Sequence, residues 1–358
     1  HRIVPEGESL DLCREELGTI AATDPGFVLG YVPDNDGDRG NLVYVDERTG
    51  KTAALDAQDF RAFTALLDQT PYASALDEAR AGASGLRVVD RALAQAFHAT
   101  TRRMLAFADG APRDVIAALL RHYDLEDLKT IARAQHAGRD PSELGEALTG
   151  AGELRPATLE ALASASDLPA AAQRLMAAGH PLATAFANAA RAYASDGDLL
   201  AFEVALDQAF FASLSEFAER SGVQPKFRAH VRREIDAANL RTALKIAGRE
   251  VDARSLFVPG GSEIELELFL ALAQAGVEGL GQIGKGTFAD VARATDLAGA
   301  ERAIRATLDE AARKAAIGDP LGVGVVIRYL RAMESEAAKL RLLARGAYYG
   351  VPRAEIEK

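Results

Sequence analysis

Three aspartates at alternate positions are the residues of this chain best placed to hold a metal ion. Asp34, Asp36 and Asp38 lie in the loop between Pro33 and Gly40. Because an extended loop can turn alternate residues to one side, their carboxylates can converge, and hard divalent cations such as Mg²⁺ need converging oxygens. A calcium-binding EF-hand loop fits poorly, since its sixth position must be glycine and here is Arg39. The alternative interpretation is an acidic surface turn.

Two short apolar segments flank this loop. Residues 27–32 and 41–45 are rich in Val, Leu and Tyr, a composition that predicts strands, and a turn is expected at residues 47–51. A helix is expected around residues 10–21. Residues 1–58 are therefore predicted to form a short α/β segment.

A second group of charged residues recurs three times in the rest of the chain. Each copy begins with an acid, carries a leucine four residues later and then two cations spaced by four. The acids are Asp124, Asp236 and Glu336, the leucines are Leu128, Leu240 and Leu340, and the cations are Lys129, Arg133, Arg241, Lys245, Arg341 and Arg345. Because residues i and i+4 share a helix face, each acid lies on the same face as its leucine.

These repeated residues are structural and interface candidates. Glu336 lies well inside its predicted helix, so it is not an N-terminal cap, and we expect each acid to pair with a cation of an adjoining helix. A solvated acid is the alternative. Cations four residues apart repel mildly in an isolated helix, so their recurrence predicts a basic edge that faces acids of this chain or of a partner. An ordinary solvated face remains the alternative there.

A second helical element recurs upstream of the acid-leucine segment in each copy. Residues 92–100 match residues 205–213, with a weaker echo at 303–309. Two elements that recur together predict three helical units of roughly a hundred residues, a size that can hold its own core. The expected fold is mainly all-α, with three pseudo-repeated lobes after the α/β segment. The predicted domains are residues 1–58, 59–150, 151–255 and 256–358.

Composition excludes several classes of function. The net charge of −11 over 358 residues opposes a nucleic-acid surface. No apolar run is long enough to span a membrane, and no signal peptide is visible. Cys13 is the only cysteine, which excludes an internal disulfide and fits a reducing compartment.

Catalysis finds no support in the helical copies. No nucleophile lies near a base, and no His/Cys cluster has metal spacing; His180, beside Pro181, is interpreted as a turn residue. The glycine-rich residues 279–287 lack the Gly-Lys-Ser/Thr ending of a phosphate loop and predict an interhelical loop. We therefore expect no enzyme, no catalytic residue and no cofactor-binding residue in this part of the chain.

Residues 34–39 resemble the metal-binding loop of the phosphohexomutases, in which an Asp-x-Asp-x-Asp-Arg stretch holds Mg²⁺ near a phosphorylated serine. The resemblance is confined to residues 1–58. It implies a Mg²⁺ site at Asp34, Asp36 and Asp38 and, as an alternative function, a Mg²⁺-dependent phosphosugar mutase. The phosphoserine and terminal phosphate-binding loops of that family are absent here, so no mutase activity is expected.

Residues 59–358 resemble the central-stalk C subunits of the V/A-type rotary ATPases, whose eukaryotic counterpart is the d subunit. The resemblance is carried by residues 123–133, 233–241 and, most specifically, 319–353. It implies three similar helical lobes about a pseudo-threefold axis, forming a funnel. It also implies a non-catalytic rotor adaptor that links the rotor shaft to the membrane proteolipid ring and transmits torque for ATP-coupled proton or sodium transport.

The implied partners are the rotor-shaft subunits and the proteolipid ring. The protein would be cytoplasmic and peripheral, held at the membrane through the membrane sector of the ATPase. No nucleic acid, no direct membrane span and no cofactor beyond Mg²⁺ at the Asp34 loop are expected. The sequence departs from that family at its start, where residues 1–58 replace the usual first helix, so the first lobe is expected to be incomplete.

Overall fold

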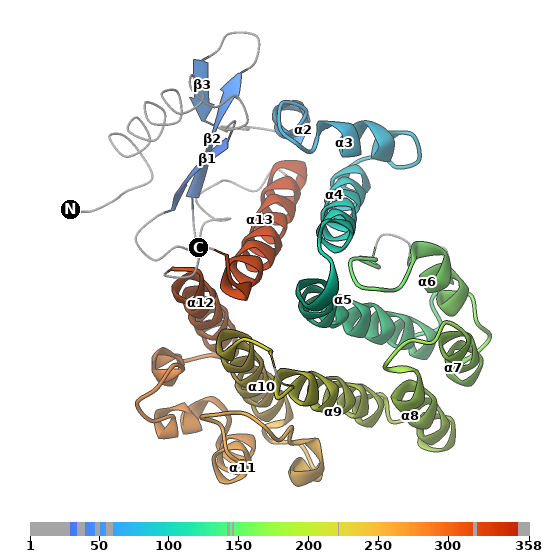
Figure 1. The fold of residues 1–358 in the computed structure, drawn as a ribbon, viewed down its shortest axis with the longest axis vertical. Coiled ribbons are helices and arrows are strands. Elements are labelled where there is room, and N and C mark those ends of the chain that lie inside the picture. Colours follow the sequence, from blue (N-terminus) through green and yellow to red (C-terminus); the bar gives the residue numbers. More distant parts are fainter. Residues whose placement is uncertain are drawn as a thin grey trace. The chain divides into compact units, whose positions relative to one another are not determined.

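The computed structural model describes most of the chain after its first residues. The described residues are 29–33, 40–46, 51–54, 60–141, 144, 147–220, 222–317 and 321–349. They are mainly helical, which confirms the predicted all-α class (Figure 1). The candidate metal ligands Asp34, Asp36 and Asp38 lie outside the described residues.

A small antiparallel sheet precedes the helices. Its strands are β1 (Leu29–Pro33), β2 (Gly40–Asp46) and β3 (Lys51–Ala54), which lie side by side in that order. Tyr31 faces Leu42 between β1 and β2, so the predicted pairing of these two segments is confirmed. The sequence did not predict β3, because this strand is only four residues long and lacks the large apolar residues that mark a strand.

Long helices follow along the chain in consecutive pairs. The pairs are α4 (Leu86–Phe107) with α5 (Gly110–His136), α9 (Leu199–Ala218) with α10 (Pro225–Ile246), and α12 (Leu297–Ala316) with α13 (Val323–Tyr349). The first helix of each pair carries the repeated segment seen at residues 92–100, and the second carries the acid-leucine segment. The two repeats of the sequence therefore correspond to the two helices of each pair.

Shorter helices lie before and between these pairs along the chain. They are α2 (Phe60–Leu67), α3 (Ala73–Arg80), α6 (Pro156–Ala163), α7 (Leu168–Ala177), α8 (Ala183–Asp196) and α11 (Leu266–Ala275), with 3₁₀ helices at Ala253–Leu256, Gly276–Gln282 and Ala289–Arg293. Aspartate caps begin three of the described α-helices: Asp167, Asp198 and Asp296 each accept a hydrogen bond from a backbone N–H of the first turn.

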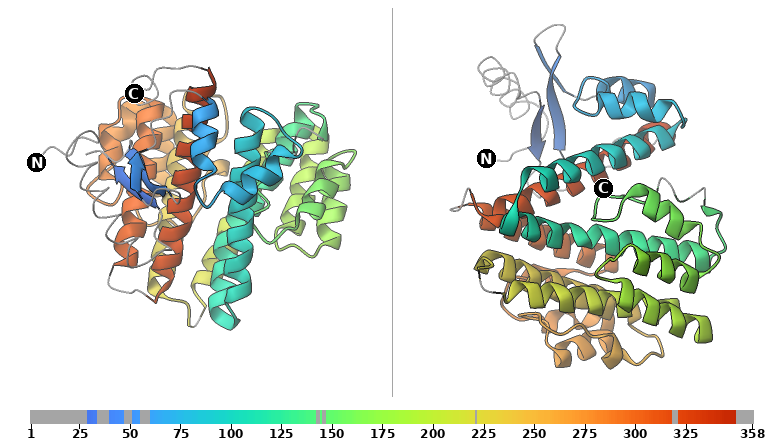
Figure 2. Two further views of the ribbon diagram at one scale, coloured as in Figure 1. Left: turned by 90° about the horizontal axis from the view of Figure 1, so that it is seen from above. Right: turned by 45° about the vertical axis from the view of Figure 1, so that its right-hand side comes forward.

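The chain divides into two compact units. The larger unit runs from Phe97 to Glu334, and the smaller one joins the residues up to Ala96 with those from Ser335 onwards. Within the larger unit α5, α9 and α10 lie side by side (Figure 2). The predicted division into three lobes, with boundaries at residues 58, 150 and 255, stays a prediction.

Each unit has its own apolar core. In the smaller unit, Phe63 of α2 and Leu93 of α4 belong to one buried cluster with Leu340 of α13. In the larger unit, Leu128 of α5 and Phe202 of α9 belong to one cluster, and Leu240 of α10 belongs to a second. Among the helices described, none is both long and apolar enough to cross a membrane.

Candidate functional site

The first repeated acid is a buried anchor for the loop that follows its helix. Asp124 of α5 is fully buried, and its carboxylate accepts hydrogen bonds from the backbone N–H groups of Glu153 (2.7 Å) and Leu154 (2.9 Å). The Nε2 atom of His180 lies 3.2 Å from the same carboxylate. Because a buried carboxylate is costly unless its oxygens are bonded, these donors stabilise both the acid and the loop.

The second repeated acid has the same role one pair later. Asp236 of α10 is fully buried and accepts from the backbone N–H groups of Ser262 (2.9 Å), Glu263 (3.2 Å) and Ile264 (2.9 Å). The Ser262 hydroxyl donates a further bond of 2.9 Å. The acid thus holds three consecutive backbone donors of the loop after α10.

A glycine allows each loop to approach its acid this closely. A Cβ atom added at Gly152 would lie 2.1 Å from Oδ1 of Asp124, and one added at Gly261 would lie 2.1 Å from Oδ1 of Asp236. Both distances are far below van der Waals contact. Close contact between a buried carboxylate and a loop glycine therefore occurs once in each of the first two copies.

The residues three positions after these acids hold the same loops. Asp127 is almost fully buried and accepts from the backbone N–H groups of Thr149 (2.7 Å) and Gly150 (2.9 Å). Asn239 exchanges two hydrogen bonds with the backbone of Val258, at 2.8 and 2.9 Å. Burial raises the pKa of Asp127 to about 6, although its bonds to the loop favour the ionised form.

The third repeated acid has a different partner. Glu336 of α13 is half-buried in the smaller unit and forms a hydrogen bond with the side chain of Tyr72. Burial raises the pKa of Glu336, and the bond to Tyr72 partly offsets this. Among the residues that the structure describes, the recorded partner of this acid is thus a side chain.

The expected pairing of each acid with a cation of an adjoining helix is therefore corrected. Asp236 is bonded to loop backbone and a serine, and Glu336 is bonded to a tyrosine. Asp124 meets the His180 ring in addition to its two loop N–H groups, but no Lys or Arg bond to it is recorded within the described residues. Backbone donors are favoured over a cation here because one carboxylate can accept several backbone hydrogen bonds in a buried site. A cation would instead add a second buried charge.

The repeated leucines lie in the core. Leu128, Leu240 and Leu340 are each at most 1% exposed. An acid and a leucine on one helix face are both buried, so that face points inward in the first two copies. The position of the leucines follows from the spacing that the sequence displays.

The repeated cations join long helices to one another. In the larger unit, Arg133 of α5 pairs with Glu203 of α9 at 2.6 Å, and Arg241 of α10 pairs with Glu301 of α12 at 2.9 Å. Lys129 of α5 also binds Asp207 of α9. These three cations thus face acids of this same chain, whereas Lys245 is exposed.

The smaller unit holds the matching pair of the third copy. Arg341 of α13 lies 3.4 Å from Asp90 of α4. Asp90, Glu203 and Glu301 each lie two residues before one of the three segments that repeat along the sequence. The second helix of one pair is therefore joined to the first helix of another pair in all three cases, and the acid stands at the same repeat position each time. The cations are not all equivalent, because Arg133 stands four residues later in its copy than Arg241 and Arg341 do in theirs. Arg345, the last of the repeated candidates, is exposed.

A further charged cluster in the larger unit was not predicted. Arg331 of α13 lies 3.3 Å from Glu234 of α10 and 2.6 Å from Asp309 of α12, and Tyr123 of α5 donates to Glu334 of α13. Burial lowers the pKa of Arg331, but the two carboxylates outweigh it and raise the value. The cluster joins four of the long helices.

Comparison with known proteins decides the family. The family model described as ATP synthase (C/AC39) subunit matches residues 52–358. The chain belongs to this family. The C subunit of a V-type ATP synthase from Deinococcus radiodurans is 38% identical over 309 residues, covering 86% of this chain and 84% of the relative. The corresponding V-type C subunit of Thermus thermophilus is 34% identical over 305 residues, covering 85% of this chain and 90% of the relative.

Archaeal relatives extend the similarity toward the start of the chain. The C subunit of the A-type ATP synthase of Haloferax volcanii is 26% identical over 351 residues, which cover 95% of this chain and 98% of the relative. An alignment of that extent must include most of residues 1–58. None of these comparisons supports the resemblance of that segment to phosphohexomutases or the alternative mutase function.

One group of side chains in this ATP synthase subunit has the composition of a metal site but does not fit one. Ligand atoms of Asp124, Glu153 and His180 lie within 4.8 Å of one another. The oxygens of Asp124 already accept two backbone bonds, and Glu153 pairs with Arg121 at 3.1 Å. Because both carboxylates are engaged and a guanidinium lies beside them, the group is a structural network.

Sequence reasoning missed the partners of the buried acids and the second polar residue of each copy. Asp127 and Asn239 stand three residues after Asp124 and Asp236, so a polar residue at this step of the repeat was a visible signal. Glycines at 152 and 261 were a second signal. Neither signal is informative alone, because the contacts between these helices and their loops span 19 to 30 residues of the chain.

Proposed function

We propose that this ATP synthase subunit is a non-catalytic adaptor of the rotor, which links the rotor shaft to the proteolipid ring and transmits torque between them. The observation that carries the proposal is the family match over residues 52–358, together with relatives named as the C subunits of V-type and A-type ATP synthases. The adaptor would lie in the cytoplasm and be held at the membrane through the other subunits.

The contacts between the long helices support a role in transmitting force. A part that passes torque must resist sliding of its helices, and ion pairs join α5 to α9, α10 to α12, and α13 to α4. Buried carboxylates fasten the loops after α5 and α10 to those helices. The buried carboxylates make local deformation costly, because displaced buried polar groups lose bonds that water cannot replace. The ion pairs are partly exposed and contribute less.

The same contacts support three similar lobes. Acids at one repeat position pair with repeated cations in three helix pairs. A pseudo-threefold arrangement, in which the third pair meets the first, accounts for the bond between Arg341 near the end of the chain and Asp90 near its start. The pseudo-threefold arrangement of the lobes is part of the proposed function.

The adaptor role is tested in an assembled rotary ATPase. ATP hydrolysis and ion transport into vesicles would be measured for the complex with this subunit and for the complex lacking it. Loss of ion transport with continued ATP hydrolysis is expected, since the soluble head keeps its catalytic sites but is no longer coupled to the membrane sector. Ion transport that continues at the full rate without the subunit would contradict the proposal.

A further inference from the structure

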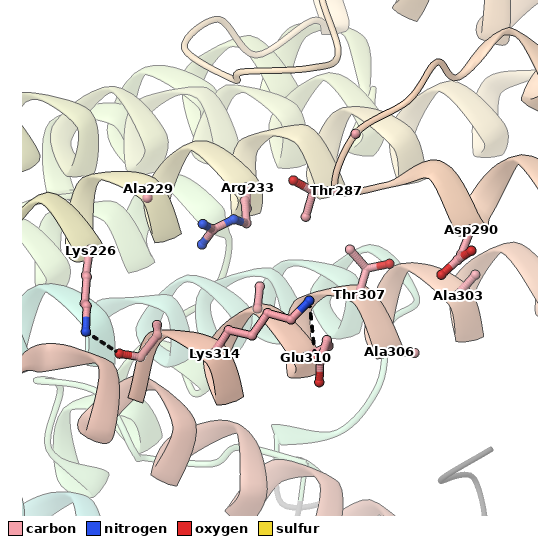
Figure 3. A pocket seen from close by; sticks show the side chains of 13 residues that line it. Lys226, Ala229, Arg233, Thr287, Asp290, Ala303, Ala306, Thr307, Glu310 and Lys314 are labelled. Atoms are coloured by element: carbon pink, nitrogen blue, oxygen red, sulfur yellow. Dashed lines mark hydrogen bonds and ion pairs between the residues drawn. The ribbon is translucent and has the colours of Figure 1, made fainter. Parts of the chain in front are cut away.

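A pocket in the larger unit is not explained by the proposed function. It has a volume of about 730 Å³ and lies between α10, α12 and residues 286–290. Figure 3 shows that Arg233 of α10 and Thr287 of the loop point into the space between the two helices. Alanines line much of the two helix faces, so small side chains leave the space open. Its volume is that of a site for a small molecule.

Positive charge is in excess at one end of this pocket. Lys226, Arg233 and Lys314 line it together, and the carboxylate of Asp290 lies toward the other end (Figure 3). This concentration of cations contrasts with the net charge of −11 of the chain. The local charge therefore complements an anion.

The acids that line the pocket are already neutralised. Glu310 pairs with Arg313 at 2.6 Å and with Lys314 at 3.3 Å, and Asp290 pairs with Arg293 at 3.1 Å. Lys226 donates to the carbonyl oxygen of Ala315 at 2.8 Å. These contacts leave the carboxylates of the pocket little capacity to neutralise a further cation.

Arg233 is the cation of the pocket that lacks such a partner. Its side chain is half-buried, and within the described part of the chain no carboxylate is recorded at ion-pair distance from its guanidinium. A guanidinium presents paired N–H donors in a planar fork that matches the oxygens of a carboxylate or phosphate. The hydroxyls of Thr287 and Thr307, which also line the pocket, are further donors.

We propose that this pocket binds a small oxyanion, a phosphate or carboxylate group, with Arg233 as its principal ligand. Lys226, Lys314 and the Thr287 hydroxyl complete the site. The proposal does not depend on the role of the subunit in the rotor. The oxyanion can be a free solute or an acidic side chain of a partner subunit, because both present the same oxygens.

The anion is held by side chains and not by the backbone of the glycine-rich loop. The N–H groups of Thr287 and Phe288 already donate to the carboxylate of Glu263, at 2.9 and 3.3 Å. A Cβ atom added at Gly286 would lie 2.4 Å from Oε2 of Glu263, so this glycine serves an internal contact. The carboxylate of Glu263 occupies the position that a phosphate takes in a backbone cradle.

The test is a calorimetric titration of the purified chain with inorganic phosphate and, separately, with citrate. Ionic strength is held constant with chloride, because added salt alone screens exposed charges. Arg233→Leu should weaken binding of both probes by about tenfold, the loss expected for one bidentate charged contact. Arg232→Leu, which removes an exposed arginine from the adjacent position of α10, should leave the dissociation constant within about twofold of the original, since its side chain is absent from the pocket lining.

A conservative variant provides a second test if Arg233→Leu fails to fold. Arg233→Lys retains the charge but removes the fork, and it should weaken binding of both probes by several-fold. Absence of saturable binding by the original chain, or equal affinities in the original chain and the Arg233 variants, would overturn the proposal.

A second titration distinguishes the two sources of the oxyanion. The same probes would be titrated into the assembled rotor complex. Retained binding identifies the natural ligand as a free anion, and binding present in the isolated chain but lost in the complex identifies a carboxylate of a partner subunit. Both results keep the assigned chemistry of the pocket.

Discussion

At the scale of single residues, the chain is stabilised by carboxylates placed where charges are usually excluded. Asp124 and Asp236 are fully buried, yet each accepts at least two backbone hydrogen bonds. The charge of such an acid contributes little to the free energy of unfolding, but removal of the acid leaves several buried N–H donors without acceptors.

Replacement of Asp236 by alanine is expected to lower the free energy of unfolding by about 3 kcal/mol, because three loop N–H groups and the Ser262 hydroxyl lose their acceptor. Urea denaturation followed by circular dichroism measures the change. Glu250→Ala, which removes an exposed acid, is the control and should change stability by less than about 0.5 kcal/mol. Equal effects of the two substitutions would show that the anchor contributes nothing.

The glycine beside this acid gives an independent prediction. Gly261→Ala places a Cβ atom 2.1 Å from Oδ1 of Asp236, so the loop or the acid must move. A loss of about 2 kcal/mol in unfolding free energy is expected from the broken contacts. Gly281→Ala is the matched control, since nothing lies within 4 Å of the added atom there. Thermal denaturation of both variants tests the difference, and a stable Gly261→Ala protein would refute the close contact.

At the scale of elements, the long helices are joined by ion pairs of unequal exposure. The side chains of Arg241 and Glu301 are 31% and 39% exposed, so solvent weakens their attraction. A double-mutant cycle with Arg241→Ala and Glu301→Ala should give a coupling energy of about 0.5 kcal/mol between α10 and α12. The same cycle on Arg293 and Asp290, which are 84% and 74% exposed, should give a coupling near zero. Coupling of equal size in both cycles would contradict a specific contact between these helices.

The cluster around Arg331 adds a dependence on pH. His230 of α10 lies 3.7 Å from Glu234 of this cluster. Burial lowers the pKa of His230 to about 4, so its imidazole is neutral in the folded protein at neutral pH. Since the unfolded pKa is about 6.5, stability from this group is complete above that pH and is lost as the pH falls toward 4. His230→Gln should remove a pH-dependent part of the unfolding free energy on the order of 3 kcal/mol over this window. Urea denaturation at several pH values tests this, and equal pH dependence in both proteins would contradict it.

The helices could be predicted from the sequence, but the hydrogen-bond partners of their buried acids could not. Leu128, Leu240 and Leu340 could be placed in the core because their spacing matches the period of a helix. The hydrogen bonds of Asp124 and Asp236 could not be predicted, because their donors are backbone groups, and every residue except proline carries the same N–H. The strand β3 was missed for a related reason, since its pairing with β2 depends on backbone bonds and not on its short, mixed side chains.

At the scale of the whole molecule, repeats along the sequence do not map simply onto compact units. The smaller unit combines α2, α3 and the start of α4 with the end of α13, and Leu340 is buried there with Phe63 and Leu93. Repeat detection compares segments in chain order, so it cannot show that the beginning and the end of the described helical region share a core. The Arg341–Asp90 pair belongs to the same unit. The first and third predicted lobes therefore depend on each other for their cores.

Binding of the purified chain to the isolated rotor shaft tests the central claim most directly. The two proteins would be mixed and separated by size-exclusion chromatography, with circular dichroism to show that the chain is helical and an unrelated helical protein as the control. The adaptor account predicts a stable complex of the chain with the shaft and none for the control. Separate elution of a folded chain and a folded shaft would contradict the account.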